Sequence, residues 1–500
     1  MARERRRTVP QGANGDKPNV LLICTDHWSG LLTGSAGHPV VMTPTIDQLA
    51  RAGTTYRNAY SACPSCIPAR RSMFTGMSPR ANGLRHYLEG AEFPQVPTLA
   101  QCFRDHGYQA FGVGKMHVSP QRNRVGFDDV LLDDQGRHQF NEIPDGAADD
   151  YELFLADQGF GGQEYAGGMA HNDWITRPWH LPEHCHPINW TAREMCRTIR
   201  RRDSSKPGFW YLSFCAPHPP VTPLQAYLEL YRDAPLEEPA TGDWSRDFDR
   251  LPHHIKKLSN PDLLAIVQAP KHALDLSRRA YYATLTHIDH QIRLVIGYLR
   301  ENGLLDNTMV VFTSDHGHMV GEHGLWCMTP FYEMSAKIPL VIVPATGDER
   351  LKAGAIDGRL ADFGDIMPRL LDLAGLPIPD HVDQLSLVGE QERSHLYGEH
   401  GEGTAAMRMI RSGRHKLIYY PVGNRRQLFD IEADPRECDD LAGEPAHGAV
   451  LAELEKLLVG ELYGEDLGWL EGGELVGLPE MEYVPAPDRN LRNQRGLRFM

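Results

Sequence analysis

Short apolar runs rich in β-branched and aromatic residues recur along the chain, without regular polar alternation. Such runs are typical of parallel strands that are buried on both faces of a sheet. Segments with helical spacing of apolar residues lie between them, and this alternation predicts a mostly parallel sheet covered by helices on both faces. The predicted strands are Val20–Cys24, Tyr108–Val113, Trp210–Phe214, Thr308–Thr313 and Ile338–Val343.

The predicted helices end at glycines, which commonly terminate helices. One helix begins at Thr43-Pro44, because proline favours the first helical position, and it ends at Gly53. Three more are predicted over Leu99–His106, Ser277–Asn302 and Asp362–Ala374, and each of these is directly followed by a glycine.

The pattern changes after Pro379, where the segments become shorter. Strand candidates at Arg408–Ile410 and His415–Tyr420 precede a helix at about His447–Leu462, which predicts a small antiparallel sheet with one packed helix. We therefore expect a basic tail at 1–17, a large α/β domain at 18–380, a small α+β domain at 381–480 and an extended tail at 481–500.

Composition narrows the class of protein and its partners. Hydrophobic residues make up 41% and charged residues 23%, which are globular values. The net charge of −15 argues against nucleic-acid binding, although a local basic pocket can still take an anionic substrate. No apolar run approaches the ~20 residues of a membrane span, and the basic N-terminus lacks the apolar segment of a secretory signal. With nine scattered cysteines, we expect a cytoplasmic protein with reduced thiols and no membrane partner.

Ionisable residues directly follow four of the predicted strands. Ligands of open parallel sheets bind beyond the carboxyl ends of the strands, so these side chains are expected to meet at one edge. A single polar residue after a strand is often structural, but four such strand ends together indicate a functional site. The residues concerned are Asp26 and His27, Lys115 and His117, His218, and Asp315, His316 and His318.

A further segment, Cys66-Ile67-Pro68-Ala69-Arg70, adds a nucleophile to this set. Pro68 favours the first turn of a helix, which places Cys66 at a helix N-terminus, where backbone N–H groups favour an anion. Arg70, four residues on, can point back toward Cys66. A nucleophile beside a guanidinium at such a position is suited to attack on an anionic ester.

These residues carry a family resemblance. Cys66-x-Pro68-x-Arg70, followed by Thr75-Gly76, resembles the signature of the formylglycine-dependent sulfatases of the alkaline-phosphatase superfamily. Other matches follow in family order, and the resemblance covers roughly Pro18 to Leu462. It implies an alkaline-phosphatase-like fold: a catalytic domain with a large mixed, mostly parallel sheet, and a smaller C-terminal antiparallel-sheet domain. The further matches are Pro18-Asn19-Val20, Gly114-Lys115-x-His117, Pro217-His218, Ser314-Asp315-His316-Gly317 and Gly321-Glu322-His323-Gly324-Leu325-Trp326.

The resemblance also implies a mechanism. A modifying enzyme, either formylglycine-generating or anaerobic, oxidises Cys66 to formylglycine (3-oxoalanine), whose hydrate attacks the sulfur of a small-molecule sulfate ester. A divalent metal, Ca or Mg with Mn or Zn as alternatives, acidifies the hydrate. The implied metal ligands are Asp26, Cys66, Asp315 and His316, with His27 as a further candidate. The implied catalytic residues are Cys66, Arg70, Lys115, His117 and His218, and the sulfate contacts are Lys115, His218 and, as a further candidate, His318.

The sequence departs from the family pattern at two places. His27 replaces a second carboxylate and His316 stands where many members have Asn, which favours Mg, Mn or Zn over Ca. Two residues after Gly-Leu-Trp, Met328 takes the position of a lysine that usually contacts sulfate and protonates the leaving group.

These departures leave alternatives to the hydrolysis of aryl or small alkyl sulfates. Relatives that hydrolyse phosphonate monoesters and phosphodiesters also lack the second carboxylate. A metal-binding homologue that lost activity with the lysine is a further alternative, against which Cys66, Arg70, Lys115, His117 and His218 are all intact. A tail with arginine at every third position, from Arg489 to Arg498, is either solvated or an oligomer contact.

Overall fold

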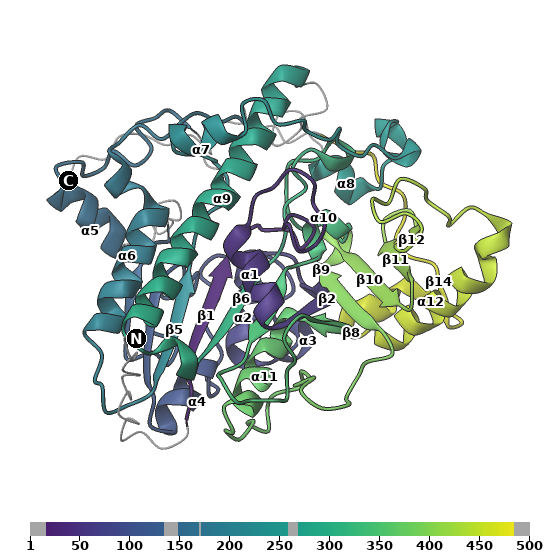
Figure 1. Cartoon of the computed structure of the whole chain (residues 1–500). Helices are drawn as coiled ribbons and strands as arrows, with labels where there is room; N and C mark the ends of the chain where they lie inside the picture. The colour runs from purple at the N-terminus through teal and green to yellow at the C-terminus, as the bar shows by residue number, and fades with distance from the viewer. Residues whose placement is uncertain (1–16, 135–148, 170–171, 259–268, 485–500) are drawn as a thin grey trace, which may run out of the picture.

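The computed structural model describes residues 17–134, 149–169, 172–258 and 269–484. Its centre is an eight-stranded sheet with the order β4-β3-β5-β1-β6-β7-β2-β8, in which only β7 is antiparallel to its neighbours (Figure 1). The strands are β1 (Asn19–Thr25), β2 (Thr54–Tyr60), β3 (Gln109–Gly114), β4 (Asp129–Leu132), β5 (Gly208–Ser213), β6 (Thr308–Ser314), β7 (Leu340–Val343) and β8 (Ala355–Asp362).

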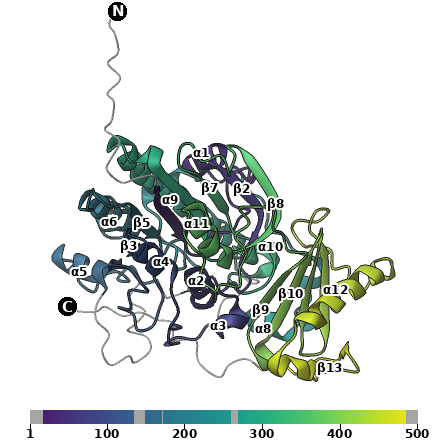
Figure 2. The ribbon, with the colours of Figure 1, turned by 90° about the horizontal axis from the view of Figure 1, so that it is seen from below.

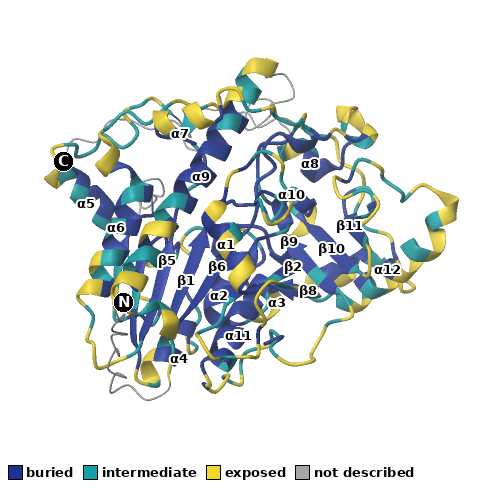
Figure 3. Ribbon diagram, in the orientation of Figure 1, coloured by how far each residue is buried: buried dark blue, intermediate teal, exposed yellow. Residues whose placement is uncertain are grey.

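Two helical layers cover this sheet, because the central strands are apolar on both faces. Side chains alternate along β1: Leu21 and Ile23 pack with the helices of one face, while Val20 and Leu22 pack with those of the other. The central strands β1, β5 and β6 are buried throughout their length (Figure 3). The first layer holds α1 (Pro44–Ala52), α5 (Asp150–Asp157), α6 (Pro187–Arg200) and α9 (Lys271–Glu301), and the second holds α2 (Cys66–Thr75), α4 (Leu99–Asp105) and α11 (Ile366–Leu373).

A second, four-stranded antiparallel sheet lies beside the large one (Figure 2). Its outer face packs against α12 (Gly448–Glu461), and its inner face packs against Phe331 and Tyr332 of the large domain. Short helices α3 (Pro79–Asn82), α7 (Gln225–Leu230), α8 (His253–Leu258) and α10 (Glu333–Ala336) complete the loops. The strands are β9 (Leu396–His400), β10 (Met407–Ser412), β11 (His415–Tyr420) and β12 (Arg425–Asp430), and a hairpin of β13 (Leu470–Glu471) and β14 (Glu474–Leu475) follows.

The predicted fold class is confirmed, and the five predicted strands correspond to β1, β3, β5, β6 and β7. Strands β2, β4 and β8 were not predicted. The long helix begins at Lys271 rather than Ser277, and the predicted helix at Asp362 begins as a 3₁₀ turn, Phe363–Asp365, before α11.

The domain boundaries at 380 and 480 stay predictions. Residues 1–16 and 485–500 of the predicted tails lie outside the described residues, as does the arginine series at the C-terminus. Among the helices that the structure describes, none combines the length and the apolar character needed to cross a membrane.

Candidate active site

The carboxyl ends of the central strands bring the predicted side chains together. Strand β1 pairs with β6 through Thr25 and Ser314, so that Asp26 and Asp315 follow at the same edge of the sheet. Both carboxylates are fully buried. Lys115 and His218 follow β3 and β5, the neighbouring strands on the other side of β1.

Cys66 faces this edge from the first turn of α2. Its Sγ lies 3.4 Å from Oδ1 of Asp26, 3.3 Å from Nε2 of His316 and 3.9 Å from Nε2 of His27. The helix predicted to begin at this cysteine is therefore present, and Gly76 ends it in the left-handed conformation. The backbone thus aims residue 66 at the two strand ends.

The predicted metal ligands form one compact donor set. Possible ligand atoms of Asp26, Cys66, Asp315 and His316 all lie within 4.8 Å of one another, and Asp26, His27, Cys66 and His218 form a second, overlapping group. Nδ1 of His316 donates to the carbonyl of Gly317 at 2.8 Å, so its Nε2 faces the site. Burial, together with the adjacent Asp26, raises the pKa of Asp315. A divalent cation fits this set, because it would relieve the repulsion between two buried carboxylates.

Arg70 is fixed by four hydrogen bonds. Its Nε donates to Asp315 at 2.8 Å, and its Nη1 donates to the Tyr211 hydroxyl and to Ser213 Oγ at 2.9 Å each, and to the carbonyl of Lys115 at 3.0 Å. Its buried Nη2 has no hydrogen-bond partner among the described residues. This guanidinium edge is therefore available to an anionic oxygen.

The Lys115 ammonium forms an ion pair with Asp26. Burial alone would raise the pKa of Asp26, but Lys115 and the neighbouring imidazoles outweigh burial and hold this pKa well below its ordinary value. Asp26 is therefore an anion over the physiological pH range, as a metal ligand must be.

The histidines occupy different positions around this cluster. His218 is buried, its Nδ1 lies 2.6 Å from the carbonyl of Pro219, and it belongs to the same compact group as Asp26, His27 and Cys66. His318 contacts His27, with 3.0 Å between their Nδ1 atoms, so its contact in the structure is with a candidate ligand. His117 has φ of 54°, and its ring lies 5.8 Å from that of Tyr87 and 3.9 Å from Glu89. The catalytic role of His117 and the sulfate contact of His318 stay predictions.

The residues that support the site were not predicted from the sequence. Tyr211 and Ser213 hold Arg70, but in the sequence they belong to an apolar strand with no sign of function. Asp134 accepts a hydrogen bond from the backbone N–H of His117 at 3.2 Å and so fixes its loop. Nothing in the sequence near residue 134 indicates this contact.

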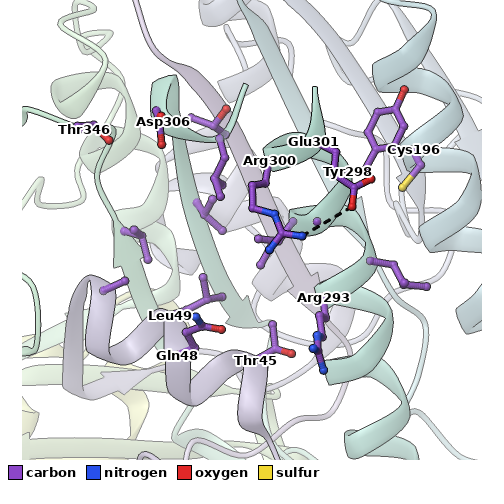
Figure 4. Close-up of a pocket in the computed structure, with 18 of the residues that line it drawn as sticks. Thr45, Gln48, Leu49, Cys196, Arg293, Tyr298, Arg300, Glu301, Asp306 and Thr346 are labelled. Carbon is purple, nitrogen blue, oxygen red and sulfur yellow. Dashed lines mark ion pairs between the residues drawn. The ribbon is translucent and has the colours of Figure 1, made fainter. Parts of the chain in front are cut away.

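A groove of about 840 Å³ lies elsewhere, between α1, α9 and the beginning of β6 (Figure 4). Thr45, Gln48, Arg293 and Arg300 line it, with Arg300 paired to Glu301 at 3.7 Å. None of the predicted site residues lines this groove, so the candidate active site remains at the carboxyl ends of the central strands.

Comparison with known proteins decides the family. The sequence matches the family described as Sulfatase over residues 18–376. The chain belongs to the sulfatase family. A second match, over residues 321–462, is to the C-terminal region of N-sulphoglucosamine sulphohydrolase. This sulfatase is therefore a sulfuric ester hydrolase by family, with a candidate metal site beside Cys66.

Individual relatives agree with this assignment. The sulfatase is 36% identical to an arylsulfatase of Clostridium perfringens over 92% of this chain and 97% of that protein. It is 30% identical to a choline-sulfatase of Rhizobium meliloti, over 86% and 83% of the two chains. The fold is similar to that of a phosphonate monoester hydrolase of Agrobacterium radiobacter, with a TM-score of 0.74, 23% identity and coverage of 91% and 98%.

Proposed function

We propose that this sulfatase hydrolyses aryl or small alkyl sulfate esters through a formylglycine hydrate derived from Cys66. The observation that carries the proposal is the position of Cys66 in the first turn of α2, with Sγ 3.4 Å from Asp26 and 3.3 Å from His316. Sulfur is a soft ligand among hard carboxylate oxygens. A hydrated aldehyde at the same position would present oxygen, which suits this donor set better.

The metal in this proposal is one divalent ion held by Asp26, Asp315, His316 and residue 66, with His27 beside them. Calcium or magnesium suits the carboxylates, and manganese or zinc suits the imidazoles. When bound, such an ion would acidify the hydrate and polarise the sulfate oxygens.

The remaining side chains have separate roles. Nη2 of Arg70, buried and without a hydrogen-bond partner among the described residues, donates to a sulfate oxygen. Lys115 adds positive charge on the same side of the site. Nε2 of His218 stabilises the departing oxygen, and His117 takes the proton of the second hydroxyl when sulfate is expelled and the aldehyde re-forms.

Hydrolysis of phosphonate monoesters or phosphodiesters is a second candidate. Its support is the donor set itself, which joins two carboxylates to the imidazoles of His27 and His316. The geometry around an anionic ester would be similar for sulfur and phosphorus, so only relative rates can separate the two activities.

One experiment tests both the nucleophile and the substrate. Mass spectrometry of the peptide containing residue 66 is expected to show loss of H₂S and gain of one oxygen in protein co-expressed with a formylglycine-generating enzyme. The same preparation is assayed on phenyl sulfate and phenyl phosphonate monoesters with equal leaving groups. A converted protein that favours the phosphonate would reverse the order of the two candidates, and an active protein with unmodified Cys66 would refute the mechanism.

A further inference from the structure

We call Asp26, Cys66, Asp315 and His316 the candidate metal cluster. Two buried histidines outside this cluster have ring nitrogens without hydrogen-bond partners in the described residues. His254 of α8 and His400 at the end of β9 are 9% and 8% exposed, and their ring centroids lie 5.9 Å apart. None of their four ring nitrogens has a hydrogen-bond partner among the described residues. Buried polar atoms are normally hydrogen-bonded, so these four nitrogens indicate a hydrogen-bonding ligand that binds here. We refer to His254 and His400 as the imidazole pair.

The alternation of side chains along β9 fixes the direction of His400. Tyr397 packs on the outer face of the small sheet with α12, and Glu399 on the same face accepts a hydrogen bond from Tyr463 at 2.8 Å. Gly398 faces inward, because a Cβ there would lie 2.7 Å from the ring of Phe331. By the same alternation His400 points inward, toward the large domain.

His254 reaches the same place from the large domain. Its neighbour Ile255 packs into the cluster between the two sheets, which also contains Met319, Leu325 and Phe331. These three residues come from the loop that follows the metal ligands Asp315 and His316. The imidazole pair therefore lies where α8, the small sheet and the active-site loop meet.

The pair is connected to the nucleophile through the backbone. The N–H of Glu399 donates to the carbonyl of Ala62 at 2.8 Å, and Ala62 belongs to the loop that leads to Cys66. The N–H of Gly401 donates to the carbonyl of Arg85 at 2.7 Å, which fixes the other side of His400.

The chemistry of the pair suits hydroxyl groups. Burial lowers the pKa of His254 to about 4 and that of His400 well below its ordinary value, so both rings are neutral near pH 7. A neutral imidazole offers one donor and one acceptor, which is what a hydroxyl group requires. Two nearby ion pairs are formed within the protein: Glu399 with Arg85 at 3.5 Å, and Arg408 with Asp466 at 2.7 Å.

We propose that His254 and His400 bind hydroxyl groups on the alcohol part of the sulfate ester, so that the enzyme favours polyhydroxylated alcohols such as sugars or phenols with further hydroxyl groups. This inference rests on the proposed hydrolysis of sulfate esters and specifies its substrate class.

The test compares esters that differ in one hydroxyl group. The substrates are 2-, 3- and 4-hydroxyphenyl sulfate, each paired with the corresponding methoxyphenyl sulfate, whose leaving group has similar acidity. We expect the wild-type kcat/KM to favour the hydroxyl member of at least one pair by about tenfold, the contribution of one well-formed hydrogen bond. His254→Leu and His400→Leu should bring this ratio close to one, whereas His254→Gln and His400→Gln, which keep a donor and an acceptor, should preserve part of it.

The controls separate this inference from the proposed function. His184→Leu changes an exposed histidine and should leave every ratio unchanged. A wild-type ratio near one for all three pairs, or Leu variants that retain the preference, would overturn the role of the imidazole pair while sulfate hydrolysis stands. If converted enzyme hydrolyses no sulfate ester, the proposed function fails instead, and the same hydroxyl and methoxy pairs made as phosphonate esters decide the role of the histidines. The Gln variants keep the test valid if a Leu variant does not fold.

Discussion

The candidate metal cluster and the imidazole pair are both buried, but their polar atoms find hydrogen-bond and ion-pair partners within the protein to different degrees. In the cluster, Asp26 pairs with Lys115, and Arg70 makes four hydrogen bonds to its surroundings. In the pair, His254 and His400 make none within the described chain. In the two proposals this contrast is a division of tasks: the groups proposed to react are held in position before the substrate binds, whereas the groups proposed to select the alcohol gain their hydrogen bonds only from the substrate.

The largest effect is expected at the nucleophile. Cys66→Ala should lower kcat/KM on phenyl sulfate by at least ~10⁴-fold, because it removes the only covalent nucleophile proposed. Thermal unfolding should change little, since a small side chain in a first helical turn contributes little to stability. Cys63→Ala, a buried cysteine of the same loop, is the matched control and should retain activity. Substantial turnover by Cys66→Ala would contradict the contrast drawn above, because the candidate metal cluster would then not contain the nucleophile.

A smaller effect concerns leaving-group protonation. Met328, which is half-buried, cannot donate a proton, so wild-type rates should depend steeply on the acidity of the leaving phenol. General acid catalysis contributes ~10²–10⁴-fold, most of all for poor leaving groups, and Met328→Lys should therefore flatten that dependence. The measurement is a series of substituted phenyl sulfates assayed with both proteins. A shallow wild-type slope that the substitution leaves unchanged would show that another acid, such as His218, already protonates the leaving group.

The support of Arg70 should be measurable on its own. Tyr211→Phe removes one of the hydrogen bonds to Nη1 while the bonds to Ser213 and Lys115 remain, so we expect kcat/KM to fall about tenfold and stability to fall by about 1 kcal/mol. Tyr56→Phe is the matched control, because the buried Tyr56 hydroxyl has no partner in the described structure. Equal kinetic losses in both variants would mean that general packing, and not the position of Arg70, accounts for the effect.

The last expected effect concerns stability at acidic pH and not turnover: it is a pH dependence of the free energy of unfolding that comes from the imidazole pair. The pKa of His254 is lowered by burial to about 4 from an ordinary value of 6.5, so the unfolded chain takes up the proton first on acidification. Stability is therefore complete above pH ~6.5 and falls as the pH drops toward 4.

For this one residue the loss at pH 5 is about 2 kcal/mol relative to pH 7. Urea unfolding at the two pH values should show a smaller loss for His254→Gln than for wild type, with His184→Gln behaving as wild type. An unchanged pH dependence in His254→Gln would mean that this ring is solvated in the folded protein.

The sequence predicted that the residues of the candidate metal cluster lie together because its signals are local, and their binding of a metal stays a prediction. Asp26, Lys115 and Asp315 each follow a strongly apolar strand, and Cys66 precedes a helix-starting proline, so each residue could be placed from its own neighbours. Strand β2 was missed because Arg57 and Asn58 interrupt its apolar pattern, and β8 because it is an edge strand with Ile356 59% exposed. Edge strands carry a weaker burial signal than central strands.

The imidazole pair could not be found in this way. His254 lies on helix α8 and His400 on strand β9, and only the packing of the small sheet against the large domain brings their rings to 5.9 Å. Tyr211 presents the same difficulty, since its hydroxyl partner Arg70 lies on a helix far away in the chain. Contacts of this kind depend on tertiary structure, for which a single sequence carries no local pattern.

Gly398 determines how closely the small sheet packs against the large domain. With no side chain at this position, β9 approaches Phe331 more closely than any other residue would allow, since a Cβ would stand 2.7 Å from the ring. Gly398→Ala should therefore push the small sheet outward and carry His400 away from residue 66, which a crystal structure of the variant would reveal. If the imidazole pair binds the alcohol as proposed, residue 398 would set the length of alcohol that reaches from residue 66 to His400. A substitution there would change substrate preference and leave the reacting groups unchanged.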